Sequence, residues 1–186
     1  LSPSQIANLT THQITMLETA DIAALDTSLI EALSSSQVAS LTTAQIRALG
    51  TDQIAAIETA ADVAALTTTQ VMAMTPAQVA ALTTDQVPEL KTSVITNLST
   101  AQLVALDTDR IAVLTTNQLR AVTTDQIVAM TTAQIVAMET ADVSYIAVGQ
   151  ITGLTTAQLS AMSTSQTAAF TDDQLAGMTA AQLAAF

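Results

Sequence analysis

The chain has 186 residues, enough for one domain with a sizeable core, and its 49% hydrophobic but 2% aromatic content predicts an ordered, aliphatic core. Sixteen acidic residues against four basic ones give a formal net charge of −12, which argues against nucleic-acid binding because that function needs a basic surface. Cysteine is absent, which excludes disulfides and thiolate chemistry, and no apolar run approaches the roughly 20 residues that membrane insertion requires.

An eight-residue repeat runs through the chain. From Gln5 to Gln53 its phase is regular; a one-residue insertion follows near residues 60–61, and the phase resumes at Asp62 and continues to Gln182. The 23 octads share the consensus L-T-T-x-Q-I-x-A, whose positions are labelled a to h. Position a is always apolar, f is Ile, Val or Leu in all but one octad, and e is Gln in 17 octads and Asp in three. Such regularity indicates a repeat architecture.

Each octad carries the signature of a helix start. Positions b to e read T-x-x-Q, the capping box in which Thr accepts from the third helical N–H and Gln reaches back to the N-cap N–H. Pro3 and Pro76 fall at c, the first helical position, where proline is favoured. Positions f and the following a then share one helical face. We expect one short helix of roughly two turns per octad, stacked on its neighbours through a and f.

The predicted fold class is therefore an all-α solenoid, or superhelix, of short capped helices. A β-solenoid is the alternative, because Thr, Ile and Val are strand formers. The abundance of Ala, Leu, Met and Gln favours helix, and four glycines in the whole chain are few for tight β corners.

Three octads differ from the consensus by carrying Glu at b and Asp at e. They contain Glu18 and Asp21, Glu58 and Asp62, and Glu139 and Asp142. Because Glu is a poor N-cap, we expect the next residue to cap instead, namely Thr19, Thr59 or Thr140. The paired carboxylates could bind a divalent cation, but calcium needs six or more oxygens, and acids at a helix N-terminus are favoured by its dipole. We interpret them as variant corners, with cation binding left open.

The stretch Val87–Leu98 matches the repeat least well. Pro88 lies in the middle of an octad and removes a helical donor, and Val94 replaces the glutamine at e. This stretch is a candidate bend. Because the repeat phase passes through it, we predict a single domain over residues 1–186.

Few residues suggest chemistry. His12 is the sole histidine, at the variable position d, and the many hydroxyls have no general base nearby in the pattern. The acid pairs Asp107–Asp109 and Asp172–Asp173 are expected to be solvated. The sequence therefore predicts no catalytic, cofactor-binding or metal-binding residues, and no enzyme. The regular row of threonines could instead bind carbohydrate or ice, which remains an alternative.

The unit L-T-T-A-Q-I-x-A-L, present with small changes at Leu41–Leu49 and Leu154–Met162, resembles the octapeptide-repeat regions of very large bacterial surface proteins described as adhesin-like. This resemblance implies an extracellular, elongated module within a longer polypeptide. The expected function is a structural spacer or stalk whose partners are neighbouring repeats. The alternative is a self-associating subunit of an extracellular filament.

Overall fold

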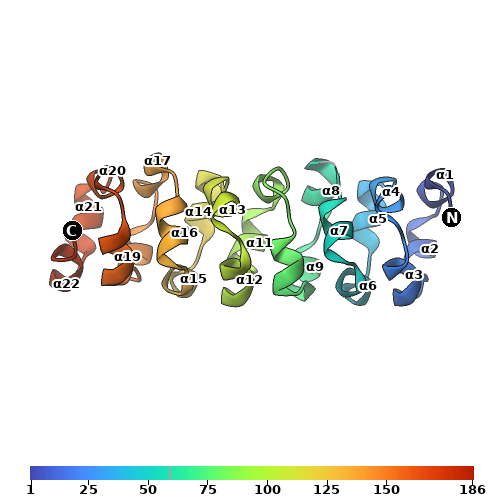
Figure 1. Cartoon of the computed structure of the whole chain (residues 1–186), viewed down its shortest axis with the longest axis horizontal. Coiled ribbons are helices and arrows are strands. Elements are labelled where there is room, and N and C mark those ends of the chain that lie inside the picture. The colour runs from blue at the N-terminus through green and yellow to red at the C-terminus, as the bar shows by residue number, and fades with distance from the viewer. Residues whose placement is uncertain (59) are drawn as a thin grey trace. The chain divides into compact units, whose positions relative to one another are not determined.

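The computed structural model describes residues 1–58 and 60–186, and these residues form short helices and no strand (Figure 1). The prediction of an all-α solenoid is confirmed, and the β-solenoid alternative is wrong. The chain divides into two compact units, Leu1–Leu98 and Ser99–Phe186.

Unit 1 contains α1 (Pro3–Ala7), α2 (Thr11–Thr15), α3 (Thr19–Ala23), α4 (Thr27–Glu31), α5 (Ser35–Ser40), α6 (Thr43–Ala48), α7 (Thr51–Ala55), α8 (Ala60–Ala65), α9 (Thr68–Ala73), α10 (Pro76–Ala80), the 3-10 helix η1 (Val87–Glu89) and α11 (Thr92–Asn97). Unit 2 contains α12 (Thr100–Ala105), α13 (Thr108–Ala112), α14 (Thr116–Ala121), α15 (Thr124–Ala129), α16 (Thr132–Ala137), α17 (Thr140–Val143), α18 (Val148–Ile151), α19 (Thr156–Ala161), α20 (Thr164–Ala168), α21 (Asp172–Gly177) and α22 (Ala180–Leu183).

Most of the described helices begin with the capping box that the sequence predicts. In α6, the Thr42 hydroxyl accepts from the Gln45 N–H at 3.2 Å, and Gln45 Oε1 accepts from the Thr42 N–H at 2.9 Å. Pro3 and Pro76 are the first residues of α1 and α10, as expected. Two otherwise unpaired N–H groups are thus satisfied at each such helix start.

The α-helices are shorter than the two turns expected from the repeat length. They contain four to six residues, little more than one turn. The chain leaves the helix early because positions a and b both take extended conformations, as at Leu41 (φ −55°, ψ 132°) and Thr42 (φ −70°, ψ 158°). These two extended residues turn the chain between one helix and the next.

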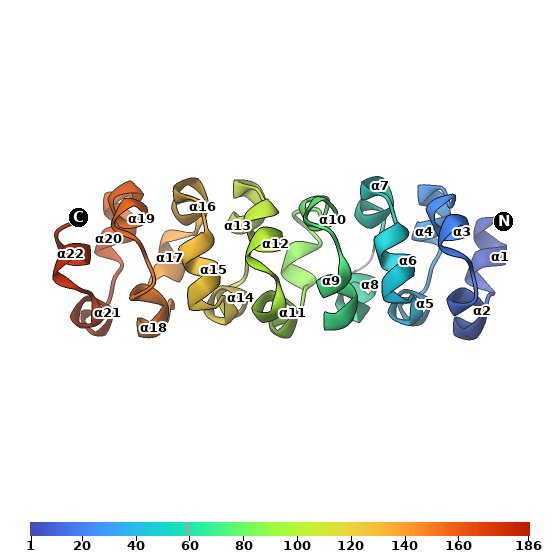
Figure 2. The same cartoon turned by 90° about the horizontal axis from the view of Figure 1, so that it is seen from below.

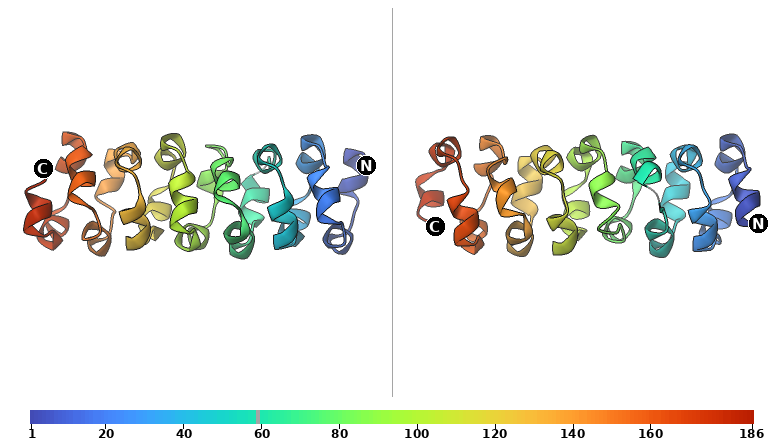
Figure 3. Two further views of the ribbon diagram at one scale, coloured as in Figure 1. Left: turned by 60° about the horizontal axis from the view of Figure 1, so that its bottom comes forward. Right: turned by 90° about the horizontal axis from the view of Figure 1, so that it is seen from above.

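The side chains at f and a form the core of each unit. Ile46 at f is 0% exposed and Leu49 at a is 4% exposed. Helices three apart pack on each other: α2 on α5 and α5 on α8 in unit 1, and α13 on α16 and α16 on α19 in unit 2. Figures 2 and 3 show the same stacking within each unit from other sides. One superhelical turn therefore takes between three and four octads.

This stacking explains the small residue at h. A β-carbon added to Gly177, at h of its octad, would overlap Val148 Cγ1, at position c three octads earlier. Gly153 stands in the same relation to Thr124. At these two octads position h faces a side chain of the preceding turn, which favours a small residue there.

The stretch 87–98 departs from the regular pattern, as expected. Val87–Glu89 forms a 3-10 helix with Pro88 at its second residue, and Lys91 precedes α11 without a side-chain cap. The boundary between the two units falls directly after Leu98. The single-domain organisation and the bend stay predictions.

Candidate functional site

Glutamine at position e joins each turn to the one before it. The Gln45 Nε2 donates to the carbonyl oxygens of Ile14 at 2.8 Å and Leu17 at 2.9 Å. In unit 2, Gln158 Nε2 donates to Ile127 and Met130, each at 2.8 Å. We call this pair of hydrogen bonds a glutamine bridge. Its acceptors lie 31 and 28 residues earlier in the chain, at positions f and a of the preceding turn.

The bridged carbonyls belong to the end of a helix. The last carbonyls of an α-helix have no partner within the helix, and burying them without one is costly. The carbonyl at f also accepts from the N–H at a, as Ile14 does from Leu17 at 3.2 Å, so the glutamine N–H₂ adds a second hydrogen bond there and supplies a partner for the carbonyl at a. The oxygen of the glutamine closes its own capping box. Gln45 and Gln158 are both 2% exposed, and no buried side-chain nitrogen or oxygen of the described residues lacks a hydrogen-bond partner.

Glutamine bridges recur along both units. They are formed by Gln37, Gln45, Gln53, Gln70, Gln78 and Gln86 in unit 1, and by Gln134, Gln150, Gln158, Gln166, Gln174 and Gln182 in unit 2. The insertion near residues 60–61 lengthens the spacing without breaking the bridges: Gln70 reaches Val38 and Leu41, which lie 32 and 29 residues earlier.

The capping box alone did not reveal this second role of the glutamine. A capping box accepts Glu as readily as Gln, because only the side-chain oxygen is used. Yet Gln fills e in 17 octads, and Glu fills it in none. The preference for an amide over a carboxylate was the available signal that the N–H₂ group has a partner of its own.

Aspartate at e makes a different contact between turns. The Asp62 carboxylate accepts from the Ser35 hydroxyl at 2.5 Å, and the Asp142 carboxylate accepts from the Thr116 hydroxyl at 2.6 Å. Both donors are at position c, three octads earlier. Asp62 and Asp142 are 6% and 7% exposed, whereas Asp21 is exposed. A short carboxylate thus pairs with a hydroxyl where glutamine would pair with carbonyls.

The expectation that a threonine caps these octads is wrong at two of them. Thr19 and Thr140 are the first residues of α3 and α17, and the N-cap positions belong to Glu18 and Glu139, whose side chains form no cap hydrogen bond. The b residue remains the N-cap because the extended a–b pair sets the helix start whatever residue occupies b. Thr59 lies outside the described residues.

Asp26 is an acidic N-cap at position b, and its carboxylate accepts two hydrogen bonds from its own octad. The Ser28 hydroxyl donates to its carboxylate at 2.7 Å, and the Leu29 N–H donates at 3.0 Å. The pKa of Asp26 lies below its usual value because both hydrogen bonds favour the charged carboxylate. The bond from Ser28 has the larger effect, followed by the bond from Leu29. Arg110 forms an ion pair with Asp107, the N-cap of its own helix.

The hydroxyls at b and c have different environments. Those at b are used as caps, as at Thr42. Those at c are mostly exposed, as at Thr43, although Thr124 donates to the Gly149 carbonyl at 3.3 Å. Binding of carbohydrate or ice by the row of threonines stays a prediction.

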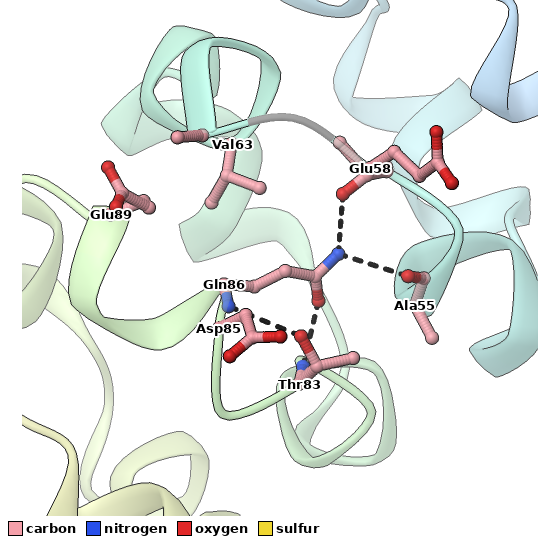
Figure 4. Close-up of a pocket in the computed structure, with 9 residues that line it drawn as sticks. Ala55, Glu58, Val63, Thr83, Asp85, Gln86 and Glu89 are labelled. Atoms are coloured by element: carbon pink, nitrogen blue, oxygen red, sulfur yellow. Dashed lines mark hydrogen bonds between the residues drawn. The ribbon is translucent and has the colours of Figure 1, made fainter.

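A pocket of about 560 Å³ lies in unit 1 where the insertion and η1 disturb the repeat. The side chain of Gln86 crosses it, donating to the carbonyls of Ala55 at 3.2 Å and Ile57 at 2.7 Å, while its Oε1 accepts from the Thr83 N–H at 2.8 Å (Figure 4). The acidic residues Glu58, Asp85 and Glu89 also line this pocket. Its polar centre is therefore occupied by a glutamine bridge.

The remaining candidates do not come together. His12 and the acid pairs Asp107–Asp109 and Asp172–Asp173 are exposed. The described residues contain no group of three or more His, Cys, Asp or Glu placed to hold a metal ion. Among the same residues, no helix has the length and apolarity needed to cross a bilayer.

Comparison with known proteins identifies the repeat. The sequence profile of the ALTTAQ repeat family matches residues 14–51, 37–61, 54–92, 111–140 and 135–172. These segments overlap and together cover well over half of the chain. The curated proteins and the solved structures each give no match.

Proposed function

Because the chain belongs to the ALTTAQ repeat family, we propose that its function is structural and lies in the repeat itself: a spacer or stalk segment, without catalysis, of a bacterial cell-surface adhesin-like protein. The observation that carries the proposal is the glutamine bridge. The side chain at e is used twice in architecture, as cap and as bridge, and the apolar side chains at a and f fill the core. Little of the repeat is left for chemistry.

A spacer has to transmit load through non-covalent contacts between its turns. In this chain each turn holds the next through buried hydrogen bonds and through aliphatic side chains at a and f. Each hydrogen bond contributes about 0.5–1.5 kcal/mol, and each fully buried aliphatic side chain about 1.5–3 kcal/mol. Because most octads add similar contacts, the stability of a repeat array grows with its length.

The extracellular location is supported by the resemblance of L-T-T-A-Q-I-x-A-L to repeats of bacterial surface proteins and by the absence of cysteine. A chain without thiols is insensitive to oxidation of cysteine outside the cell. The acidic surface keeps an aliphatic-rich chain in solution.

Small-angle X-ray scattering tests the spacer role. We expect the maximum dimension of the protein to increase by an equal step for each additional copy of Leu154–Ala161 inserted after Ala161. A spacer requires this proportionality, because its length follows the number of octads. A maximum dimension that stays constant as octads are added would contradict the proposal.

A further inference from the structure

The neighbouring helices α17 and α18 differ from the rest of unit 2 at their starts. Each contains four residues, whereas α15, α16 and α19 contain six. Their N-cap residues are Glu139 and Ala147, and neither side chain forms a cap hydrogen bond. In the other described helices of unit 2 the side chain at b accepts from the N–H three residues later, as the Thr131 hydroxyl does from Gln134 at 3.2 Å. Two consecutive helices therefore lack a stabilising cap.

The octad of α17 also has fewer hydrogen bonds to the preceding turn. Its carboxylate at e, Asp142, accepts from the Thr116 hydroxyl, whereas a glutamine at e donates to two carbonyls, as Gln134 does. The following turn binds both octads in the usual way, because Gln174 and Gln182 form complete glutamine bridges to them. The deficit of α17 is thus confined to its cap and to its contact with the preceding turn.

A glycine and two exposed apolar side chains accompany this deficit. Gly149 lies inside α18, and a β-carbon there would meet no atom within 4 Å, so no close contact requires glycine at this position. Glycine inside a helix lowers its stability, because glycine loses more backbone freedom on folding than other residues. Tyr145 and Val148 are 52% and 41% exposed, so both side chains leave much of their surface outside the core. Each of these features weakens the same stretch of chain.

We propose that residues 139–153 of unit 2 form a weak segment that opens and closes as one unit while the octads on either side stay folded. Proteins open locally in contiguous units, and the cost of opening is lowest where stabilising contacts are fewest. The segment begins at the first uncapped residue and ends before α19, whose N-cap Thr155 accepts from the Gln158 N–H at 3.1 Å. The two uncapped helices are consecutive, so both fall within one such unit.

In a spacer, the function proposed above, this segment would be the first to lengthen under load. Full extension of residues 139–153 spans about 50 Å, at about 3.3–3.6 Å per residue. The capped and bridged octads on either side would stay closed meanwhile. This consequence rests on the proposed function, whereas the opening itself does not, so the two proposals can fail separately.

The N–H at position a is a matched probe of opening, because it donates to the carbonyl at f in successive octads. These buried residues are Met130, Met138, Ile146 and Leu154, with donor–acceptor distances of 3.2, 3.3, 3.2 and 3.0 Å. Amide hydrogen exchange of the 186-residue chain, resolved by nuclear magnetic resonance near neutral pH, gives the rate at each. After correction for intrinsic rates, exchange at Ile146 and Leu154 should be at least about tenfold faster than at Met130 and Met138. Equal rates at all four amides would overturn the inference.

The next residue at position a separates local opening from unfolding that spreads from elsewhere in unit 2. Met162 follows Leu154 by one octad, and its N–H donates to the Leu159 carbonyl at 3.1 Å. A weak segment confined to residues 139–153 predicts slower exchange at Met162 than at Leu154. Exchange at Met162 as fast as at Leu154 would place the opening outside this segment and overturn the inference.

Restoring a cap tests the cause. Ala147→Thr places a hydroxyl at an exposed N-cap whose backbone is already extended (φ −68°, ψ 148°), as in the capped octads. The matched control, Ala141→Thr, makes the same substitution at the exposed position d of α17, where a hydroxyl is not at an N-cap. Ala147→Thr should slow exchange at both Ile146 and Leu154 by about fivefold, and Ala141→Thr should slow neither. Equal effects of the two variants, or slowing at one of the two amides alone, would overturn the inference.

Discussion

The glutamine at e has two hydrogen-bonding ends with separate roles, and this division governs what each substitution should do. Its oxygen closes a capping box within its own octad, and its nitrogen binds carbonyls of the preceding turn. The first role is local to one octad. The second is buried. Its loss leaves the Ile127 carbonyl with the Met130 N–H alone and takes the glutamine hydrogen bond from the Met130 carbonyl.

Substitution of an interior glutamine by glutamate separates the two roles. Gln158→Glu keeps the cap acceptor but removes both donors to Ile127 and Met130 and places a carboxylate in a 2% exposed site. An unpaired buried charge costs about 3–5 kcal/mol, and we expect a loss of this order in urea unfolding near neutral pH. Gln5→Glu, at an exposed position, is the control and should change stability by less than about 0.5 kcal/mol.

The cost of Gln158→Glu should also depend on pH. Burial raises the pKa of the introduced carboxyl in the folded state above its unfolded value of about 4.3. The penalty is therefore present at neutral pH, fades as the pH falls through the raised pKa of the folded state, and disappears below the unfolded pKa, where the carboxyl is protonated in both states. A difference between Gln158→Glu and the unmodified protein that is independent of pH would contradict this account.

The N-cap hydroxyl is a second residue-scale determinant. Thr42→Ala removes the acceptor of the Gln45 N–H and should lower stability by about 0.5–2 kcal/mol. Thr43→Ala removes an equivalent exposed hydroxyl at c and should be nearly neutral. Chemical denaturation of the two variants checks the difference, and equal effects would mean that the cap contributes nothing specific.

At the scale of the element, an octad is a short helix held by neighbours rather than by its own length. A helix of four to six residues is unstable in isolation because nucleation is costly. Its persistence depends on the fit between turns, where position c of one octad packs above position h three octads later. The size of the residue at h is therefore limited by a residue far away in the sequence.

Gly177→Ala tests this fit. The added β-carbon would overlap Val148 Cγ1, and a β-branched side chain has little freedom to move aside, so we expect a loss of about 1 kcal/mol or more in denaturant unfolding. In a Val148→Ala background the same change should become neutral or stabilising, because alanine favours helix by about 0.5–1 kcal/mol over glycine. Gly149→Ala, which meets no atom within 4 Å, is the control and should not destabilise.

The local half of this architecture could be predicted, and the contacts between turns could not. T-x-x-Q with proline at c indicated the helix starts, and the apolar a and f positions indicated the core. The glutamine bridges span 28 and 31 residues, a distance set by the extended a–b pair and not visible in an eight-residue period. For the same reason, the pairing of Asp142 with Thr116 and the contact that Gly177 at h makes with Val148 had no signal within a single octad.

At the scale of the whole molecule, the charge acts against compaction. The acidic side chains are exposed apart from Asp62 and Asp142, and four basic residues offset few of the sixteen. Repulsion between like charges destabilises a folded state and is screened by salt, with a Debye length of about 30 Å at 0.01 M and about 8 Å at 0.15 M.

Stability should therefore rise with ionic strength. We expect the urea midpoint to be higher in 0.15 M than in 0.01 M sodium chloride. The slope of the free energy of unfolding against urea concentration should be unchanged, because the same surface is exposed on unfolding. Replacing exposed acids by their amides, as in Asp172→Asn/Asp173→Asn, should reduce the difference between the two salts. A midpoint that falls as salt is added would mean that attractive ion pairs dominate instead.

The self-similar connection between turns has a consequence for how such genes change. A typical octad donates from its glutamine to carbonyls of the preceding turn, and its own carbonyls at f and a accept in the same way from the following turn. The insertion near residues 60–61 lengthens this spacing by one residue without removing the bridges. Unequal recombination that adds or deletes whole octads therefore joins compatible surfaces, and selection can adjust the length of the array while leaving its chemistry untouched.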